Sequence, residues 1–429
     1  MHLPLALILR QEPCHDNKIA LGHEIVFIVR PEVCSGARSH RSCPQPFIFV
    51  NPRSAQRLLL ALHTYGGSFM HVPSLLGRTG FSVDAVLTPR HPLRHVRGFK
   101  ETFSAAPSEW ASAVERRLLT GKYALLLNVD EPGLIALSRH SWHPEAARFL
   151  PFLPGSEIAA TVGSKKAFYE WCLKNGLAVP ETHYRHSFEE AVLLAQKLPG
   201  AWLVKGDTGS GGQTVVPVSP SLDPKAVPLQ KSRVWLVQKD EGRSVGSGIF
   251  LADHGRLVAW IGIKKIVCLK QGFGPTVLGG GDMSEDVGGL CERVAMASGI
   301  TGLTGFDFVR NPGRGPLLID SHLGRMSPMQ HFDRLYGVDF GTGLRTCLEG
   351  RETKCAEPVQ GPLFVKFPEV LQLAMQGGLG HLLKNLDAAA KMPLSPPREP
   401  LIGFRSACGT VFSQARVNLG SWRRAMRRL

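Results

Sequence analysis

The sequence lacks several features that define common classes of protein. No run of 18 apolar residues occurs, so no membrane-spanning helix is predicted. None of the 9 cysteines forms a CxxC pair, and their odd number and irregular spacing argue against a disulfide framework or a zinc cluster. There is no Gly-x-Ser-x-Gly nucleophile motif and no internal repeat. Because the cysteines show no disulfide pattern, a reducing, cytoplasmic location is expected.

The charge balance is strongly basic. The chain has 50 Lys and Arg residues against 35 Asp and Glu residues, which gives a net charge of +15. Such an excess attracts nucleic acid, but it also suits an anionic small molecule such as a nucleoside triphosphate. The basic residues are dispersed apart from a run at 422–429, which we expect to be a solvated end. Small molecules are therefore the favoured partners, and nucleic acid is the least favoured. No membrane partner is expected, and the oligomeric state is not indicated.

The length of 429 residues predicts two or three domains. Residues 1–55 show no clear periodicity and are expected to form a poorly packed leader. Within 56–150, apolar runs at 58–62, 81–87 and 123–127 alternate with helical patterns. Strands that alternate with helices predict a small α/β domain with a parallel sheet.

The pattern of residues 151–350 predicts a mixture of helices and strands. Ser164 can cap a helix, and Ser187 with Glu190 forms a capping box at the start of another. Strands are expected at 201–205, 234–238, 248–251, 256–261, 303–310 and 317–320, with a helix around 287–297. We divide this region into 151–235 and 236–350, and proline-rich breaks mark 351–429 as an appendage.

The strongest local signal is a lysine at the end of a predicted strand, followed by a glycine-rich loop. Lys205 precedes Gly206, Gly209, Gly211 and Gly212. Backbone amides exposed by glycine can cradle phosphate oxygens, and the lysine adds a cation. The loop lacks the Gly-Lys-Ser/Thr ending of a P-loop and the GxGxxG of a dinucleotide site. Without other evidence, the loop is equally consistent with a plain hairpin turn.

A second signal lies in two predicted strands that are joined by a short turn at 311–313. This turn would place Asp307 beside Asp320, and two such carboxylates repel unless a cation lies between them. Magnesium prefers oxygen ligands and bridges substrate phosphates, so it suits such a pair. His322 comes two residues after Asp320 and therefore points to the same face of its strand. The alternative is two aspartates that are solvated separately.

The order of these parts over residues 57–350 resembles the ATP-grasp superfamily of carboxylate–amine ligases. Lys165 and Lys166, followed by a Gly-Leu-Ala-Val-Pro segment at 176–180, are similar to the lysine-bearing helix and the segment after it. Lys205 and the loop at 209–212 resemble the strand lysine and the lid over the triphosphate. The segment 235–242 resembles the hinge that binds adenine.

The resemblance extends to the metal ligands, although these depart from the usual residues. Asp307, Asp320 and His322 have the family's spacing of thirteen and then two residues. Asp320 stands where a glutamate is usual, and His322 stands where an asparagine is usual. Arg325 follows His322 by three residues, whereas the family's arginine follows its asparagine by two.

The resemblance implies an α/β fold, with α+β character in the ATP-binding part, and the use of ATP with Mg²⁺, or alternatively Mn²⁺. The implied activity is ligation of a carboxylate, activated as an acyl phosphate, to an amine or a thiol. Variable loops such as 264–281 would line the substrate pocket. A non-catalytic ATP-binding protein of the same fold, and a basic nucleic-acid-binding protein, are the alternatives. The residues implied for nucleotide binding are Lys165, Lys166, Lys205, Gly209, Ser210, Gly211, Gly212, Gln238, Lys239 and Glu241. Those implied for the metal are Asp307, Asp320 and His322, and those for catalysis are Lys205 and Arg325.

Overall fold

The structure is a computed structural model that describes residues 57–376, except 65–66, 210, 213, 228–231, 243, 271–272, 312, 353 and 367–368. All described residues belong to one unit, 49–429. The predicted leader at 1–55 and the basic run at 422–429 lie outside the described residues. None of the helices in the described part of the chain has the length and apolar character needed to cross a membrane.

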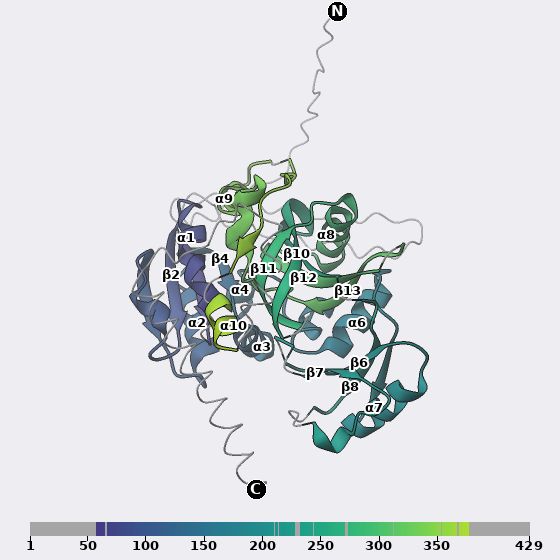
Figure 1. Ribbon diagram of the computed structural model, residues 1–429. Helices are drawn as coiled ribbons and strands as arrows, with labels where there is room; N and C mark the ends of the chain where they lie inside the picture. The colour runs from purple at the N-terminus through teal and green to yellow at the C-terminus, as the bar shows by residue number, and fades with distance from the viewer. Residues whose placement is uncertain are drawn as a thin grey trace, which may run out of the picture. The chain divides into compact units, whose positions relative to one another are not determined.

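The first sheet is the parallel sheet that the sequence predicts. Its strands are β1 (Arg57–Leu62), β2 (Ser82–Leu87), β3 (Phe99–Ser104) and β4 (Tyr123–Asn128). They lie in the order β3-β2-β1-β4, and every neighbouring pair is parallel (Figure 1). The strand β3 has mostly exposed or half-buried side chains, so its apolar signal was too weak to predict.

Short helices connect and cover these strands. They are η1 (Gly67–His71), α1 (Val72–Gly77), η2 (Pro92–His95), α2 (Trp110–Leu118), α3 (Glu131–Arg139) and α4 (Pro144–Ala147). The buried face of α2 consists of Trp110, Val114 and Leu118, which pack in one core with Leu126 of β4. Helix α2 corresponds to the apolar spacing of the sequence, and its burial closes one face of the parallel sheet.

A second, antiparallel sheet has the order β5-β8-β6-β7. Its strands are β5 (Thr182–Arg185), β6 (Trp202–Gly206), β7 (Val215–Val218) and β8 (Trp235–Lys239). Helix α7 (Phe188–Lys197) packs against this sheet, and η3 (Pro224–Ala226) lies beside α7. The helices α5 (Glu157–Ala160) and α6 (Lys165–Lys174) instead share a core with Phe250 and Phe306. The predicted caps are present, because Ser164 accepts a hydrogen bond from the amide of Ala167 and Ser187 accepts one from the amide of Glu190, each at 3.1 Å.

The third sheet has the order β13-β12-β9-β10-β11-β14. Its strands are β9 (Ser244–Asp253), β10 (Arg256–Lys270), β11 (Phe273–Gly281), β12 (Gly302–Asn311), β13 (Gly315–Ser321) and β14 (Phe364–Val365). Its helices are α8 (Glu285–Ser298), η4 (Gln330–Tyr336), α9 (Phe340–Leu348) and α10 (Glu369–Met375). The buried face of α8 packs against Trp260 of β10 and Phe250 of β9 in one core.

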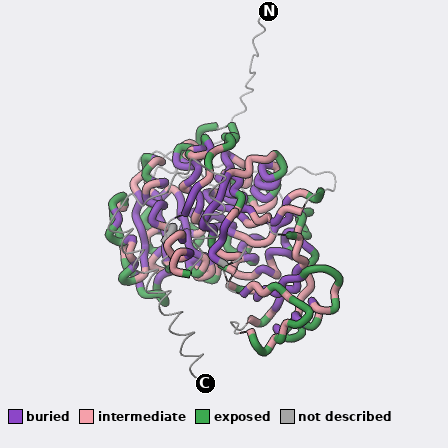
Figure 2. Tube along the Cα trace, in the orientation of Figure 1, coloured by how far each residue is buried: buried purple, intermediate pink, exposed green. Residues whose placement is uncertain are grey.

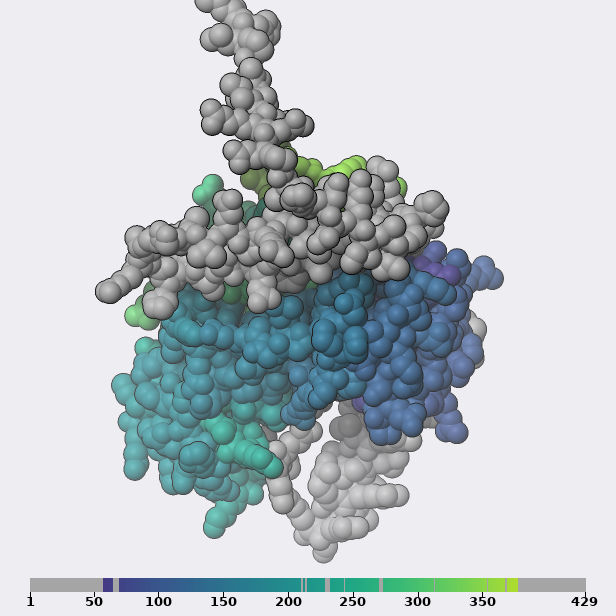
Figure 3. Space-filling model, turned by 180° about the vertical axis from the view of Figure 1, so that it is seen from behind, coloured from purple at the N-terminus to yellow at the C-terminus, as the bar shows by residue number. Residues whose placement is uncertain are grey.

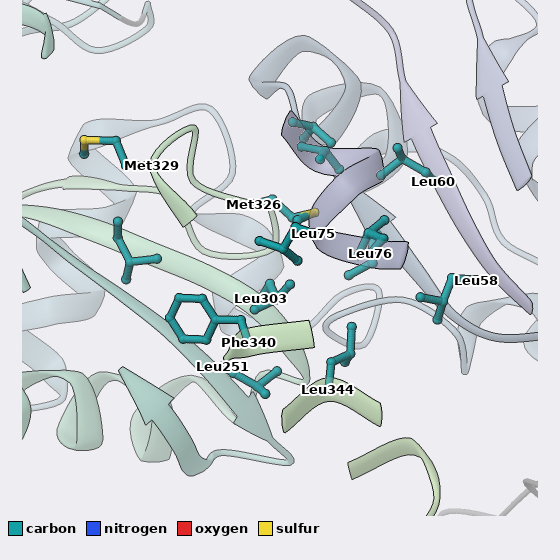
Figure 4. Close-up of a cluster of buried hydrophobic side chains, with 14 of the residues drawn as sticks. Leu58, Leu60, Leu75, Leu76, Leu251, Leu303, Met326, Met329, Phe340 and Leu344 are labelled. Atoms are coloured by element: carbon teal, nitrogen blue, oxygen red, sulfur yellow. The ribbon is translucent and has the colours of Figure 1, made fainter. Parts of the chain in front are cut away.

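One hydrophobic core joins the parallel sheet to the six-stranded sheet. Leu58 and Leu60 of β1 belong to the same cluster as Leu251 of β9 and Phe340 of α9 (Figure 4). The antiparallel sheet β5-β8-β6-β7 instead packs with α7 in a separate core. Figure 2 shows the buried residues (purple) gathered in the interior, and Figure 3 shows the surfaces of the parallel sheet (blue) and of the antiparallel sheet β5-β8-β6-β7 (teal) on opposite sides.

Three sequence expectations differ from these elements. The boundary expected between 235 and 236 falls inside β8, which pairs with β5 and β6 in the four-stranded sheet. The expected variable loop at 264–281 is a hairpin of β10 and β11, because Val267, Val277 and Leu278 are buried against their neighbours. Within the expected appendage, β14 pairs with β11, so it extends the six-stranded sheet.

Candidate nucleotide-binding active site

Strands of the two antiparallel sheets and the segments beside them line a cavity of about 550 Å³. Its lining comes mainly from α6, β6, β7, the glycine-rich loop, the end of β8 and the chain after it, the β10–β11 hairpin, β12, β13, the segment 322–329 and the residues after β14. The predicted site residues that line it are Lys165, Lys205, Gly209, Gly211, Gly212, Gln238, Lys239, Glu241, Asp307, Asp320, His322 and Arg325. Lys166 is not among the lining residues, and Ser210 lies outside the described residues.

The two adjacent lysines at the start of α6 have different positions. The Nζ atom of Lys165 donates a hydrogen bond to the carbonyl of Gly209 at 2.6 Å and lies 3.9 Å from Oδ1 of Asp320. The Nζ atom of Lys166 instead pairs with Glu170 at 2.6 Å, one turn further along the helix. Consecutive helical residues point in directions about 100° apart. The prediction for Lys166 is therefore corrected, and Lys165 is the lysine of this pair that lines the cavity.

Lys205 is a buried cation at the end of β6, with only 5% of its surface exposed. Its Nζ atom donates to Oε1 of Gln238, and the amide of Gln238 donates in turn to Oγ1 of Thr182 at 3.2 Å. Burial lowers the pKa of Lys205 to about 8, although the negative charge of Asp320 acts in the opposite direction. The protein therefore holds a nearly desolvated ammonium group in the same cavity as Asp320.

The glycine-rich loop has backbone conformations that favour glycine. Gly209, Gly211 and Gly212 have φ angles of 106°, 62° and 68°. A Cβ atom on Gly212 would lie 2.9 Å from the backbone nitrogen of Gly274 in β11, so the loop approaches the β10–β11 hairpin closely. The loop also lies beside Lys165, which binds the carbonyl of Gly209. These glycines therefore shape the cavity wall between β6 and the hairpin.

The end of β8 and the segment after it supply both signs of charge to the cavity. Lys239, Asp240 and Glu241 all line it. The backbone amides of Lys239 and Asp240 bind the carbonyls of Glu181 and Ala201 at 2.9 and 2.8 Å. Their backbone position is thus fixed by neighbouring segments, while their side chains remain part of the cavity lining.

Asp307 and Asp320 lie opposite each other in the register of β12 and β13, as the sequence predicts. A protein cation already neutralises Asp307, because Nζ of Lys265 lies 2.6 Å from its Oδ2 atom. Ser247 donates to the other oxygen at 2.5 Å. Burial raises the pKa of Asp307, but the charge of Lys265 and these hydrogen bonds outweigh burial and lower it. The cation that the sequence analysis expected at this pair is thus supplied at Asp307 by Lys265, so the two carboxylates do not by themselves require a metal ion.

His322 is buried beside this pair, with its Nε2 atom 3.9 Å from Oδ2 of Asp307. Burial, together with the positive charge of Arg325, lowers the pKa of His322 to about 4, so its imidazole is neutral at neutral pH. Its Nδ1 atom is buried and has no hydrogen-bond partner among the described residues. A neutral imidazole with an unpartnered nitrogen has the protonation state that a metal ligand requires.

Asp320 and His322 are too few to bind a magnesium ion by themselves. They fit an ion whose remaining ligands are nucleotide phosphates and water. Within the described residues, no group of three or more His, Cys, Asp and Glu side chains forms a metal cluster. Magnesium at nucleotide sites, however, uses one or two carboxylates, and phosphates and water complete its shell. Asp320 faces the cavity without a lysine at hydrogen-bonding distance, and His322 offers its unpartnered nitrogen. We therefore regard Asp320 and His322 as the available donors.

Sequence analysis missed several polar residues of the cavity. Lys265 and Thr276 lie on the β10–β11 hairpin, and Lys366 and Glu369 follow β14. The apolar run at 266–269, which follows Lys265 directly, was a strand signal, but it does not indicate which face of the strand Lys265 occupies. No local pattern pointed to Lys366 or Glu369, because the pairing of β14 with β11 brings them to the cavity.

Comparison of the sequence with protein-family models and with curated proteins finds no match. Solved structures are similar in fold. The ADP complex of an N5-carboxyaminoimidazole ribonucleotide synthetase aligns with a TM-score of 0.56 and 12% identity, covering 75% of this chain and 85% of that one. The biotin carboxylase domain of Hydrogenobacter thermophilus 2-oxoglutarate carboxylase, solved with MgADP, ADP and bicarbonate, gives a TM-score of 0.54, 15% identity and 72% coverage of both chains.

Phosphoribosylamine–glycine ligase from Thermotoga maritima gives a TM-score of 0.54 with 12% identity, and the match covers 72% of this chain and 81% of that chain. These identities are low, so the likeness concerns the fold. The chain has the ATP-grasp fold, as the order of its sequence motifs predicted. The similar structures include enzymes named as ligases or synthetases, and two of the three were solved with ADP.

Proposed function

We propose that the protein is an ATP-dependent ligase that activates a carboxylate and joins it to an amine or a thiol. The observation that carries the proposal is one cavity in which Lys165, Lys205 and Lys265 converge with Asp307 and Asp320. Three ammonium groups suit a triphosphate, because phosphoryl transfer depends mainly on positioning and on neutralising the charge of the phosphate oxygens. The ATP-grasp fold and the similar ligases support the same class of reaction.

The proposed roles follow from the positions of the side chains. Lys165 and Lys205 would hold the phosphates nearest the glycine-rich loop, and the amides of Gly209, Gly211 and Gly212 would contact the outer phosphates. The segment 238–241 would hold the base. Arg325, which lines the cavity beside His322, would contact the transferred phosphoryl group.

The reaction would proceed in two steps. A substrate carboxylate oxygen forms a bond to the γ-phosphorus, and the bond from that phosphorus to the β,γ-bridging oxygen breaks, which leaves ADP. The nucleophile then forms a bond to the acyl carbon, while the carbon–oxygen bond to phosphate breaks with its electron pair on the phosphate, and the nucleophile loses a proton. Lys205 and Arg325 orient and neutralise the phosphates, and exclusion of water from the cavity during turnover would limit hydrolysis of the acyl phosphate.

Magnesium is the metal that we propose, with Mn²⁺ as the alternative. Asp320 and His322 would hold it, and Asp307 would join them if Lys265 moved to a phosphate. When bound, the ion would neutralise charge on the phosphate oxygens. Lys265 supplies positive charge at Asp307 in any case, so the protein's own lysine and the metal would share this task.

The test measures ADP release from the full chain with a panel of carboxylates, with and without Mg²⁺, and uses a high concentration of hydroxylamine to trap an acyl phosphate as its hydroxamate. We expect ADP release that depends on a carboxylate and is matched by hydroxamate. Binding of a non-hydrolysable ATP analogue is measured in parallel. Nucleotide binding without hydroxamate from any carboxylate would favour a non-catalytic ATP-binding protein, and absence of nucleotide binding would refute both.

A further inference from the structure

The two carboxylates on β12 and β13 differ in what they can still bind. The side chain of Asp307 is 15% exposed, and both of its oxygens have partners, because Lys265 lies 2.6 Å from Oδ2 and Ser247 donates to Oδ1 at 2.5 Å. The side chain of Asp320 is 33% exposed. Its Oδ1 atom accepts a hydrogen bond from the amide of Ser321 at 3.0 Å, while no described residue donates one to its Oδ2 atom. Of the two residues, Asp320 is therefore the one with an oxygen left for a ligand.

The six-stranded sheet holds Lys265 against Asp307. Lys265 lies on β10, where it pairs with Gly279 of β11, and its side chain is 9% exposed and reaches across β9 to Asp307 on β12. Ser247, the β9 residue opposite Asp307 in register, holds the other carboxylate oxygen. Moving Lys265 away would leave a largely buried carboxylate without its charged partner, which is costly. The pair should therefore persist when a nucleotide binds.

A lysine in this position keeps a metal ion away from Asp307. Asp307 and Asp320 are cross-strand partners, and the Cβ atoms of such partners lie about 4.5–5.5 Å apart. Sites that bind two metal ions hold them about 3.5–4 Å apart, so this carboxylate pair has the scale of such a site. An ammonium group and a divalent ion repel each other strongly, however, when both contact one carboxylate in a buried place. Lys265 thus supplies at Asp307 the positive charge that one ion of a pair would supply.

We infer that Lys265 takes the place of a second metal ion, so that the nucleotide complex of this protein contains one divalent ion and Asp307 is not among its ligands. The inference rests on the proposed nucleotide site and adds the number of ions that the site takes. Asp320 and His322 hold the single ion, and the triphosphate supplies further oxygens. A latent metal site follows from the same arrangement. Without Lys265, the carboxylates of Asp307 and Asp320 would bind a divalent ion together, even in the absence of a nucleotide.

The test counts the Mn²⁺ ions bound to the full chain by electron paramagnetic resonance, which detects the free ion. With one equivalent of a non-hydrolysable ATP analogue, the parent chain should bind one Mn²⁺ and Lys265→Met should bind two. Without a nucleotide, Lys265→Met should bind Mn²⁺ roughly 10- to 150-fold more tightly than the parent chain, because loss of the charge-assisted contact frees Asp307 for the ion. Lys264→Met is the matched control and should behave as the parent chain does, since Lys264 is exposed and does not line the cavity.

A count other than one Mn²⁺ in the analogue complex of the parent chain would overturn the inference. So would equal nucleotide-free Mn²⁺ affinity in Lys265→Met and Lys264→Met, or a gain that persists when Asp307→Asn is added to Lys265→Met. If Lys265→Met does not fold, the count in the parent complex decides the result. Failure of the parent chain to bind the analogue would refute the proposed function, whereas the nucleotide-free comparison would still test Lys265. The two failures are therefore distinguishable.

Discussion

Lys205 leads to a prediction about how nucleotide affinity depends on pH. Its ammonium group is 5% exposed, and burial lowers its pKa to about 8, while the nearby Asp320 opposes the shift. A triphosphate binds the charged form of the lysine. The charged fraction is about nine-tenths at pH 7 and about one-tenth at pH 9, so the affinity for ATP should fall roughly tenfold between these values. The sign follows because the binding-competent, protonated form is lost as the pH rises through about 8.

The assay is a titration of a non-hydrolysable ATP analogue at pH values from 6.5 to 9.5. Lys205→Met should lower the affinity roughly 10- to 150-fold at pH 7, since it removes a charge-assisted contact worth about 1.5–3 kcal/mol. The variant should also lose the decline between pH 7 and pH 9. Lys166→Met is the matched control, because Lys166 pairs with Glu170 outside the cavity lining, and it should keep both the affinity and the decline.

A flat profile in the parent chain would refute the reasoning that Lys205 contacts the triphosphate. The same conclusion would follow if Lys205→Met bound the analogue as tightly as Lys166→Met. If the decline persisted in Lys205→Met, another group would be responsible for it.

Three further predictions concern the loop, the metal and the core. Gly212→Ala should lower ATP affinity more than Gly155→Ala, because both residues have positive φ but only Gly212 would place a Cβ atom against Gly274; calorimetry with the ATP analogue measures the difference. Replacing both Asp307 and Asp320 with Asn, or removing the metal with EDTA, should abolish most of the ADP release, whereas His322→Asn should keep or improve turnover with magnesium. If manganese or zinc supports the parent chain and His322→Asn abolishes activity, the choice of magnesium is contradicted. Asp333→Asn should lower the free energy of unfolding by about 1.5–3 kcal/mol in urea titrations, because it removes a charge-assisted contact with Arg78 at 2.8 Å while Asp339 still pairs with Arg78 at 3.2 Å. An unchanged midpoint would count against this ion pair.

Sequence patterns predicted many of the elements whose burial is regular, although β11 was taken as part of a variable loop. The apolar runs at 58–62 and 123–127 correspond to β1 and β4, and the short turn expected at 311–313 gave the correct pairing of β12 with β13. The strands β3, β5 and β7 were missed, because their side chains are half-buried or exposed and carry little periodicity. Strands of this kind are fixed by pairing with their neighbours, which a local pattern does not contain.

The candidate site was predictable where its residues lie within a motif. Lys205, Asp307 and Asp320 were found in this way, and the structure brings all three to one cavity. The choice between Lys165 and Lys166 needed the helix phase, which the structure supplies. Lys265 was missed because it pairs with Asp307 across 42 residues of sequence. Long-range pairs of this kind depend on the strand order of the sheet.

The antiparallel sheet β5-β8-β6-β7 has a hydrophobic core of its own, and this has a consequence for how the sheet can move relative to the other two. Phe188, Val204 and Trp235 pack with one another and not with the core that joins the other two sheets. A lobe that buries its own apolar side chains can rotate without exposing them to water, so hydrophobic free energy does not oppose the rotation. One contact at its edge is the hydrogen bond from Lys165 to the Gly209 carbonyl. The affinity of the cavity for an anion and the angle of this lobe should therefore be thermodynamically linked.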